Sequence, residues 1–173
     1  MFVNFILVTL AWPSDGNNVG VVDLSGASYI KFRKMTITRN GASSSYGYVV
    51  YLRGGSSYNT FEHCRLIGTS YSGNSANFAT VFTPSGSNEN YNTFRNNVIS
   101  NNSYGFYLYG SNSNSTEYMT IDSNNINGMY YEGIYSYYGT NIINKNIIQT
   151  FGISNSGAGI DQNWARWSHI TRN

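Results

Sequence analysis

The sequence repeats itself every 22 to 33 residues, and this repeat constrains the fold more than any other feature. Each copy has an aromatic residue, a large apolar residue three positions later, an Asn after three more, and a second large apolar residue two positions further on. Segments 29–37, 58–66, 91–99, 118–126, 140–148 and the broken 167–173 fit this pattern wholly or in part. The first apolar residues, called anchors below, are Phe32, Phe61, Phe94, Ile121, Ile143 and Ile170.

The repeated segments are predicted to be β-strands rather than helices. They are short, rich in Thr, Ile, Tyr and Phe, and interrupted by Asn and Gly, and they lack a sustained apolar spacing of three and four residues. A second strand follows each segment, usually after a Gly, at 46–55, 76–86, 104–111, 132–139 and 158–163. Each repeat is therefore expected to hold at least two short strands.

Stacking of these repeats predicts an all-β fold, a single-stranded parallel β-helix (solenoid) of about five coils. Parallel strands need a long connection, and one repeat is long enough to make a full circuit. Coils about 4.8 Å apart would place the anchors in one inner column. A second inner column would hold Ile37, Leu66, Ile99, Ile126 and Ile148. Residues 1–19 are expected to be a truncated strand or entry segment, and 20–173 the repeats, with an incomplete last coil and hence a fragment of a longer protein.

The composition favours a folded chain and excludes several classes of partner. Aromatic residues make up 16% and hydrophobic residues 40% of the sequence, which is untypical of disorder. The net charge is +2 and the longest basic run is 31–34, so nucleic acid and anionic membranes are not expected partners. The apolar stretch 5–12 is shorter than the roughly 20 residues that span a bilayer, and it lacks the basic leader of a signal peptide. We predict no transmembrane segment.

The residues that usually carry chemistry are few and scattered. The single Cys64 can form no internal disulfide and is interpreted as a small buried hydrophobe, while His63 and His169 fall in different repeats. The carboxylates are Asp15, Asp23, Glu62, Glu89, Glu117, Asp122, Glu132 and Asp161, and no two are adjacent. Arg53 and Asp161 lie in second-strand segments, isolated from any cluster in the sequence. The sequence therefore predicts no catalytic residue, no metal site and no cofactor.

Two further columns follow from the alignment. A structural Asn ladder is predicted from Asn97, Asn124, Asn146 and Asn173, beginning at the third coil because Met35 and Cys64 replace Asn in the first two. Asn tolerates the left-handed conformation of a tight corner, and stacked Asn side chains can hydrogen-bond from coil to coil. The position after the anchor reads Arg33, Glu62, Arg95 and Asp122, which predicts ion pairs between coils.

Aromatic residues are predicted to form exposed columns. If Gly47, Gly105 and Gly133 start equivalent strands, alternation places Tyr48, Phe106 and Ile134 inside. The same alignment places Tyr51, Phe82, Tyr109 and Tyr137 outside in one column. A second column would hold Tyr29, Tyr58, Tyr91, Tyr118 and Trp167. Aromatic rings at regular spacing can bind sugars, which makes the first column a candidate polysaccharide site. The alternative is that Tyr favours strands and stacks on its neighbours.

Segments 91–111 and 140–149 resemble the parallel β-helix repeat of the pectin-lyase-like superfamily, in which Asn-x-Ile-x-Asn-Asn precedes Gly-Ile-x-Leu. Segments 20–37 and 49–68 look more narrowly like secreted surface proteins of Bacteroidetes-type bacteria. The resemblance implies a right-handed helix, in line with the handedness of parallel crossovers, a secreted or cell-surface location, and continuation into further repeats or domains.

Enzymes with this fold include polysaccharide lyases and polygalacturonase-like hydrolases, but their Asn-Thr-Asp, Asp-Asp and Gly-His-Gly elements are absent from this sequence. We therefore expect a non-catalytic secreted or cell-surface module with a structural or adhesive role, which binds polysaccharide through its aromatic columns. The alternative is a fragment of a polysaccharide lyase or glycoside hydrolase that acts on uronic-acid polymers, and the sequence leaves the question of enzymatic activity open.

Overall fold

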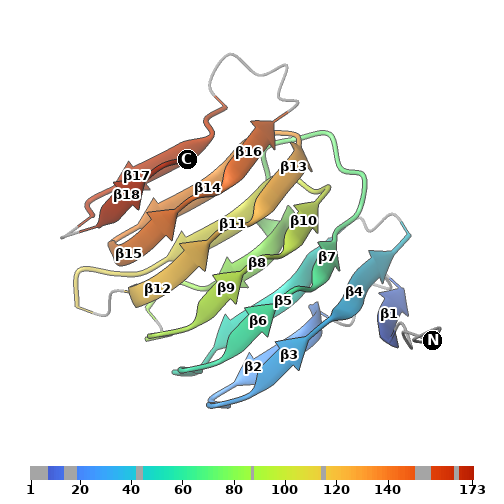
Figure 1. Ribbon diagram of the computed structural model, residues 1–173, viewed down its shortest axis with the longest axis horizontal. Coiled ribbons are helices and arrows are strands. Elements are labelled where there is room, and N and C mark those ends of the chain that lie inside the picture. Colours follow the sequence, from blue (N-terminus) through green and yellow to red (C-terminus); the bar gives the residue numbers. More distant parts are fainter. Residues whose placement is uncertain are drawn as a thin grey trace, which may run out of the picture.

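Each coil of the chain contributes one strand to each of three parallel sheets, so the repeats stack into a β-solenoid of about five coils (Figure 1). The computed structural model describes residues 8–13, 19–41, 45–86, 88–113, 116–150, 157–165 and 168–173. Equivalent strands of successive coils lie side by side from the N-terminal to the C-terminal end of the solenoid (Figure 1). The predicted all-β parallel solenoid is confirmed.

The three sheets are named A, B and C. Sheet A contains β1(Val8–Pro13), β4(Met35–Asn40), β7(Arg65–Ile67), β10(Val98–Ser100), β13(Asn125–Met129) and β16(Ile147–Thr150). Sheet B contains β2(Gly20–Ser25), β5(Tyr48–Arg53), β8(Ala79–Thr83), β11(Tyr104–Tyr109), β14(Glu132–Tyr137) and β17(Ile160–Asn163). Sheet C contains β3(Lys31–Arg33), β6(Thr60–Glu62), β9(Thr93–Arg95), β12(Thr116–Asp122), β15(Gly139–Asn144) and β18(His169–Thr171). A short 3₁₀ helix, η1(Ala76–Phe78), precedes β8.

The hydrophobic core contains the two predicted inner columns together with inward residues of sheet B, such as Phe106 and Ile134. Strand registers place the anchors above one another, in the order Phe32, Phe61, Phe94, Ile121, Ile143 and Ile170. Ile170, at the C-terminal end of this first column, is 45% exposed. The second column runs through Ile37, Leu66, Ile99, Ile126 and Ile148. The Phe61 ring stacks on Phe94 with centroids 4.8 Å apart. Burying one such side chain stabilises the fold by about 1.5–3 kcal/mol, and the coils repeat this contribution.

Each anchor segment contains a corner and forms two strands rather than one. In the second coil, β6 ends at Glu62 and β7 begins at Arg65, with His63 between them at φ 54°. Phe61 and Leu66 are an odd number of residues apart, so a single strand would point them to opposite faces. The corner turns both inward, and both are fully buried.

The residue with a left-handed backbone conformation at this corner is the one before the ladder Asn. The prediction that the ladder Asn itself adopts this conformation is therefore wrong. The residues with positive φ at this corner are Lys34, His63, Asn96, Ser123, Lys145 and Arg172. Five of these six are exposed, whereas the ladder residue that follows each of Asn96, Ser123 and Lys145 is buried. The backbone of the first residue makes the turn, and the Asn side chain is thereby directed toward the neighbouring coils.

A hydrogen-bonded ladder joins Asn97, Asn124, Asn146 and Asn173. In each step, the backbone N–H and the side-chain amide of one Asn donate to Oδ1 of the next at 2.8–3.0 Å. Asn97 Nδ2 also donates to the Phe61 carbonyl at 2.9 Å. The Cys64 N–H donates to Asn97 Oδ1, so the Asn side chains of this ladder start at the third coil. Because these amides are buried, the ladder fixes the register of the coils.

A second ladder of the same kind joins Asn59 to Asn92. Both the backbone N–H and Nδ2 of Asn59 donate to Asn92 Oδ1, at 2.9 and 3.0 Å, and both residues are fully buried. Sequence reasoning missed this ladder, although Asn directly follows the first aromatic residue in two aligned segments and recurs as Asn141 in a third. Met119 interrupts it between Asn92 and Asn141.

We expect Asn124→Ala to destabilise the protein by about 2–4 kcal/mol, because it leaves the backbone and side-chain N–H groups of Asn97 without their buried acceptor. The melting temperature should fall by roughly 5–15 °C, which thermal unfolding followed by circular dichroism would measure. Asn125→Ala is the matched control, since Asn125 is the exposed neighbour and should cost about 0.5 kcal/mol or less. Equal losses in the two variants would contradict a register held by the ladder.

Candidate functional site

A continuous network of aromatic side chains lies on and beside the outer face of sheet B, and we call it the aromatic face. Each of its rings contacts at least one other ring of the set. Its members are Tyr46, Tyr48, Tyr51, Phe82, Tyr104, Tyr107, Tyr109, Tyr131, Tyr135, Tyr137, Tyr138 and Trp164. The face brings together all four residues proposed from the sequence to contact polysaccharide.

These four residues belong to two columns, so the prediction that they share one column is wrong. The first column runs through Tyr51, Phe82, Tyr107 and Tyr135. The second pairs Tyr109 with Tyr137, two residues further along the strands. The error comes from treating Gly47 and Gly105 as equivalent. Val50 and Phe106 are both in register with Val81, so Gly105 corresponds to Val49 and Gly47 lies two residues out of step.

A local irregularity explains why Tyr48 also departs from its predicted position. In β5, Val49 and Val50 both belong to the buried core. Tyr48 therefore lies on the outer face, whereas the sequence predicts it inside. Tyr48 is nevertheless only 3% exposed, because neighbouring rings cover it. Phe106 and Ile134 are fully buried in the core, as predicted.

In β11 the residue next to Phe106 is Gly105, where an added Cβ would lie 2.5 Å from the Gly133 carbonyl oxygen and 2.8 Å from Ile126 Cγ2. Only glycine fits between the coils at this point.

The aromatic face contains both near-parallel pairs, such as Tyr109–Tyr137 at 19°, and steeply angled pairs. Tyr104 meets Tyr107 at 79°, and Tyr137 meets Tyr138 at 87°. Trp164 stacks on Tyr138 at 5.8 Å and is 69% exposed. Because the planes differ, rings do not cover one another completely, and π-faces are available to a ligand.

The other predicted aromatic column forms a regular ladder at the corner between sheets B and C. Its members are Tyr29, Tyr58, Tyr91 and Tyr118, whose centroids are 4.8–5.0 Å apart with interplanar angles of 3–12°. All four have positive φ values of 56–64°. Near-parallel rings at this spacing cover each other's faces and expose mainly their edges. Trp167, the predicted continuation, lies outside the described residues.

Charged side chains lie at both ends of the aromatic face. At the N-terminal end, Arg53 Nε and Nη2 donate to the two Asp23 carboxylate oxygens at 2.9 and 2.8 Å, and the guanidinium lies 5.2 Å from the Tyr51 ring centroid. At the C-terminal end, Asp161 is in register with Tyr135 and accepts a hydrogen bond from Asn163 Nδ2 at 2.9 Å. Arg53 and Asp161, which are isolated in the sequence, thus each have a partner in the fold.

Glu132 is the least expected residue at the C-terminal end of the aromatic face. It is in register with Tyr104 and only 3% exposed, and its Oε2 has no hydrogen-bond partner among the described residues. Burial, together with the charge of Asp161, raises the pKa of Glu132 to about 7. Burial also raises the pKa of Tyr107 to about 12, and the neighbouring Tyr135, Tyr109 and Glu132 add to that effect.

Sequence reasoning missed the association of Glu132 with Asp161 because 29 residues separate them. Aligning 132–139 with 158–163 on their Gly-Ile pairs would have placed Asp161 beside Tyr135, three residues after Glu132. The burial of Glu132 has no signal in the sequence.

We expect Glu132→Gln to stabilise the protein above pH 7 and to leave it nearly unchanged below pH 4.5. Between these values the unfolded carboxyl ionises near 4.5, whereas the folded one holds its proton to about 7, so the wild type loses stability as the pH rises. The variant lacks this loss and should be more stable by about 1–2 kcal/mol at pH 8. Urea unfolding at pH 4 and pH 8 would measure the difference, and a variant less stable at pH 8 would refute the buried acid.

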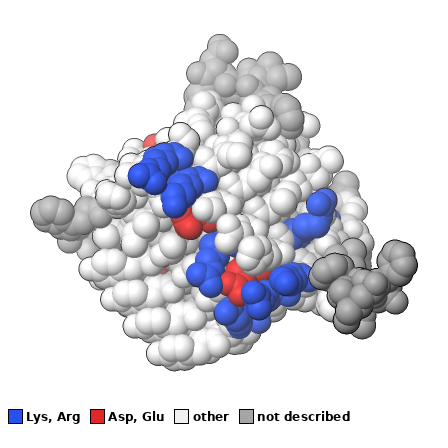
Figure 2. All heavy atoms as spheres, in the orientation of Figure 1, with Lys and Arg blue, Asp and Glu red and all other residues white. Residues whose placement is uncertain are grey.

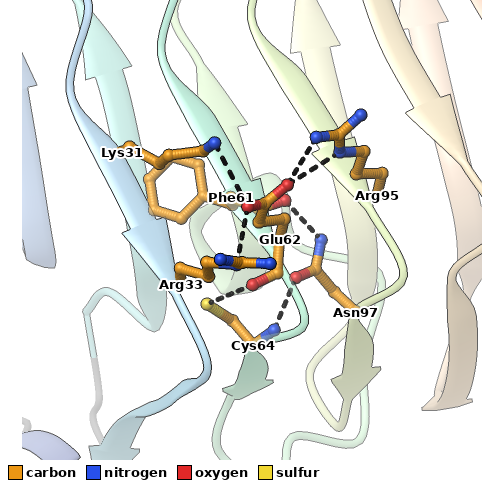
Figure 3. A network of polar contacts seen from close by, with 7 residues as sticks. All are labelled: Lys31, Arg33, Phe61, Glu62, Cys64, Arg95 and Asn97. Carbon is orange, nitrogen blue, oxygen red and sulfur yellow. Dashed lines mark hydrogen bonds and ion pairs between the residues drawn. The ribbon is translucent and has the colours of Figure 1, made fainter.

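A second charged cluster lies on sheet C, where Glu62 accepts from three basic side chains (Figure 3). Lys31 Nζ and Arg33 Nε contact Oε1 at 3.2 and 2.9 Å. Arg95 Nε and Nη2 donate to Oε2 at 2.9 and 2.6 Å. Figure 2 shows such a group of basic side chains around an acidic one, with further basic side chains elsewhere on a face that is otherwise mostly uncharged. Hydrogen bonds from Arg95 are the main cause that lowers the pKa of Glu62 to about 2.

The cluster confirms part of the predicted charge column. The register places Arg33, Glu62, Arg95 and Asp122 in sequence, and Glu62 pairs with the Arg on either side. Asp122 instead accepts a hydrogen bond from Asn144 Nδ2 at 2.9 Å. The ion pairs therefore join the first three coils of sheet C.

We expect Glu62→Gln to destabilise the protein at pH 7, because three cations lose their shared carboxylate. The lowered pKa means that the wild-type contribution is present above about pH 4.5 and disappears as the pH falls toward about 2. The difference between wild type and variant should therefore shrink on acidification, opposite to the pattern for Glu132→Gln. Chemical unfolding across this pH range would measure it, and a constant difference would contradict the ionised network.

Within the described ranges, no group of three or more His, Cys, Asp or Glu side chains is placed to hold a metal ion. His63 and His169 are both exposed and belong to different coils of the solenoid. Cys64 is buried.

Among the residues that the structure describes, no helix is long and apolar enough to cross a membrane.

Comparison with known proteins finds no match: no family model fits the chain, and searches of curated proteins and of solved structures give no significant similarity. The site must therefore be interpreted from its own geometry.

Proposed function

We propose that this chain is a non-catalytic glycan-binding module, secreted or at the cell surface, whose polysaccharide ligand lies on the aromatic face. The observation that carries the proposal is the continuous ring network on sheet B, in which T-shaped and tilted pairs leave π-faces open to a sugar. A structural or adhesive role follows, because a rigid solenoid with such a face can attach to a polymer without altering it.

Polar groups beside the rings support this proposal. Arg53 and Asp23 at one end, and Asp161 and Asn163 at the other, can exchange hydrogen bonds with sugar hydroxyls. Hydrophobic rings with a few placed polar groups are the usual composition of a small-molecule or sugar site. The corner ladder of tyrosines lacks this arrangement, since its rings cover one another.

We also retain, as part of the proposal, a relation to the pectin-lyase-like superfamily and to bacterial surface proteins. It is supported by the repeat pattern in segments 91–111 and 140–149 and by the solenoid fold. The proposed continuation into further repeats in a longer parent chain rests on the same resemblance.

One observation favours a second candidate, a polysaccharide lyase or glycoside hydrolase. Glu132, with a pKa of about 7, is suited to donate a proton, and Asp161 is a second carboxylate nearby. Against it, Glu132 is 3% exposed, and two carboxylates disfavour a uronic-acid polymer. Turnover of a polysaccharide that is abolished by Glu132→Gln would establish the enzyme and overturn the non-catalytic proposal.

We expect the double variant Tyr109→Ala/Tyr137→Ala to lose retention on a polysaccharide, with a fall in affinity of roughly tenfold or more, about 1.4 kcal/mol. These rings stack at 4.8 Å on the aromatic face and are only partly buried, so their removal should disturb the ligand more than the fold. Affinity electrophoresis against a panel of soluble glycans would measure retention.

The matched control is Tyr58→Ala/Tyr91→Ala, which removes a ring pair at the same 4.8 Å spacing from the corner ladder. This variant should bind as the wild type does. Loss of retention in the control but not in the first variant would move the site to the corner, and a wild-type protein that no glycan retains would refute the proposed function.

A further inference from the structure

Charge is distributed unevenly around the solenoid. The strands of sheet B carry Asp23, Glu132 and Asp161, and in the described part of the chain their one basic side chain is Arg53. Arg53 is occupied by a bidentate pair with Asp23 at the N-terminal end of the aromatic face. Among the described residues of its strands, the C-terminal end of sheet B carries only acidic charged side chains, whereas Lys31, Arg33 and Arg95 lie on sheet C.

The two carboxyl groups at this acidic end act on each other. Asp161 raises the pKa of Glu132 by its charge, and no basic side chain is among the groups that shift it. Glu132 is nine-tenths buried or more, and its Oε2 lacks a hydrogen-bond partner in the ranges that the structure describes. The buried Glu132 oxygen without a hydrogen-bond donor is unfavourable. A cationic donor bound beside Asp161 would stabilise the Asp161 carboxylate and, through its charge, the ionised form of Glu132.

The surroundings select an organic cation rather than a metal ion. Two carboxyls and the Asn163 amide supply fewer oxygen ligands than the six to eight that Ca²⁺ takes. Tyr135 and Tyr137 are in register with Asp161 and Asn163, so aromatic rings border the acidic end. An ammonium group beside aromatic rings gains a cation–π attraction in addition to the carboxylate contacts.

We infer that the aromatic face recognises a glycan that carries free amino groups, with Asp161 binding a protonated amine beside the buried Glu132 carboxyl while the adjoining rings contact the sugar. This inference rests on the proposed function and adds the substrate class. The Asp161 carboxylate repels a uronic-acid polymer, so the face discriminates between cationic and anionic glycans.

The test compares ligands with the same backbone and different charge. β-1,4-linked oligomers of glucosamine, N-acetylglucosamine and glucose, matched in length, are titrated by calorimetry at about pH 6, where the amines are protonated. The glucosamine oligomer should bind about fivefold or more tighter than the glucose oligomer at low salt, and this preference should shrink as salt screens the charges. An oligogalacturonate should bind most weakly.

Two variants assign the preference to the acidic end. Asp161→Asn should abolish the preference for glucosamine and change glucose-oligomer affinity less than twofold. Asp122→Asn removes the same charge from sheet C and should retain the preference, which separates a local contact from net charge. Glu132→Gln should leave the preference at about pH 6 nearly unchanged, because a carboxyl with a pKa of about 7 is largely protonated there.

The outcomes are distinguishable. Binding of the glucose oligomer with equal or weaker binding of the glucosamine oligomer would overturn the amino-sugar inference and leave the glycan-binding proposal in place. An equal loss of preference in Asp122→Asn would also overturn it, since net charge would then be the cause. No binding of any oligomer would refute both proposals together.

Discussion

The structure depends on stacking equivalent residues directly above one another, and buried asparagine amides hold that stacking in register. The amides of Asn97, Asn124 and Asn146 each donate to the next coil and to a backbone carbonyl of the preceding one. A slip by one residue would leave these buried donors unpaired and turn the apolar columns outward. Core packing tolerates variation between Phe and Ile at the anchors, whereas the amide geometry tolerates little.

The same stacking gives each sheet its own outer surface, since any residue type that recurs in register becomes a column. On sheet C this produces Glu62 among its three cations, and on sheet B it produces the rings of the aromatic face. We expect recurrence alone not to make a binding site at the corner, because the near-parallel tyrosines there cover each other's faces. On sheet B, the steeply angled pairs leave ring faces open.

The inner columns and the Asn ladder could be predicted because they recur in nearly every coil. The outer columns of sheet B could not be aligned, because the extra inward residue at Val49 and Gly105 breaks the simple alternation and no glycine marks it consistently. The corner inside each anchor segment was detectable in principle, since Phe61 and Leu66 are separated by an odd number of residues yet both apolar. The buried carboxyl of Glu132 was not detectable, because its environment comes from a coil that lies 29 residues away.

The most direct test of the account is an NMR titration that follows the ring signals of ¹³C-labelled tyrosine while a glucosamine oligomer is added. The account predicts shift changes at Tyr107, Tyr109, Tyr135 and Tyr137 on the aromatic face, and none at Tyr58 and Tyr91 of the corner ladder, which serve as an internal reference in the same sample. Changes confined to the corner ladder, or none at saturating ligand, would contradict a glycan site on sheet B.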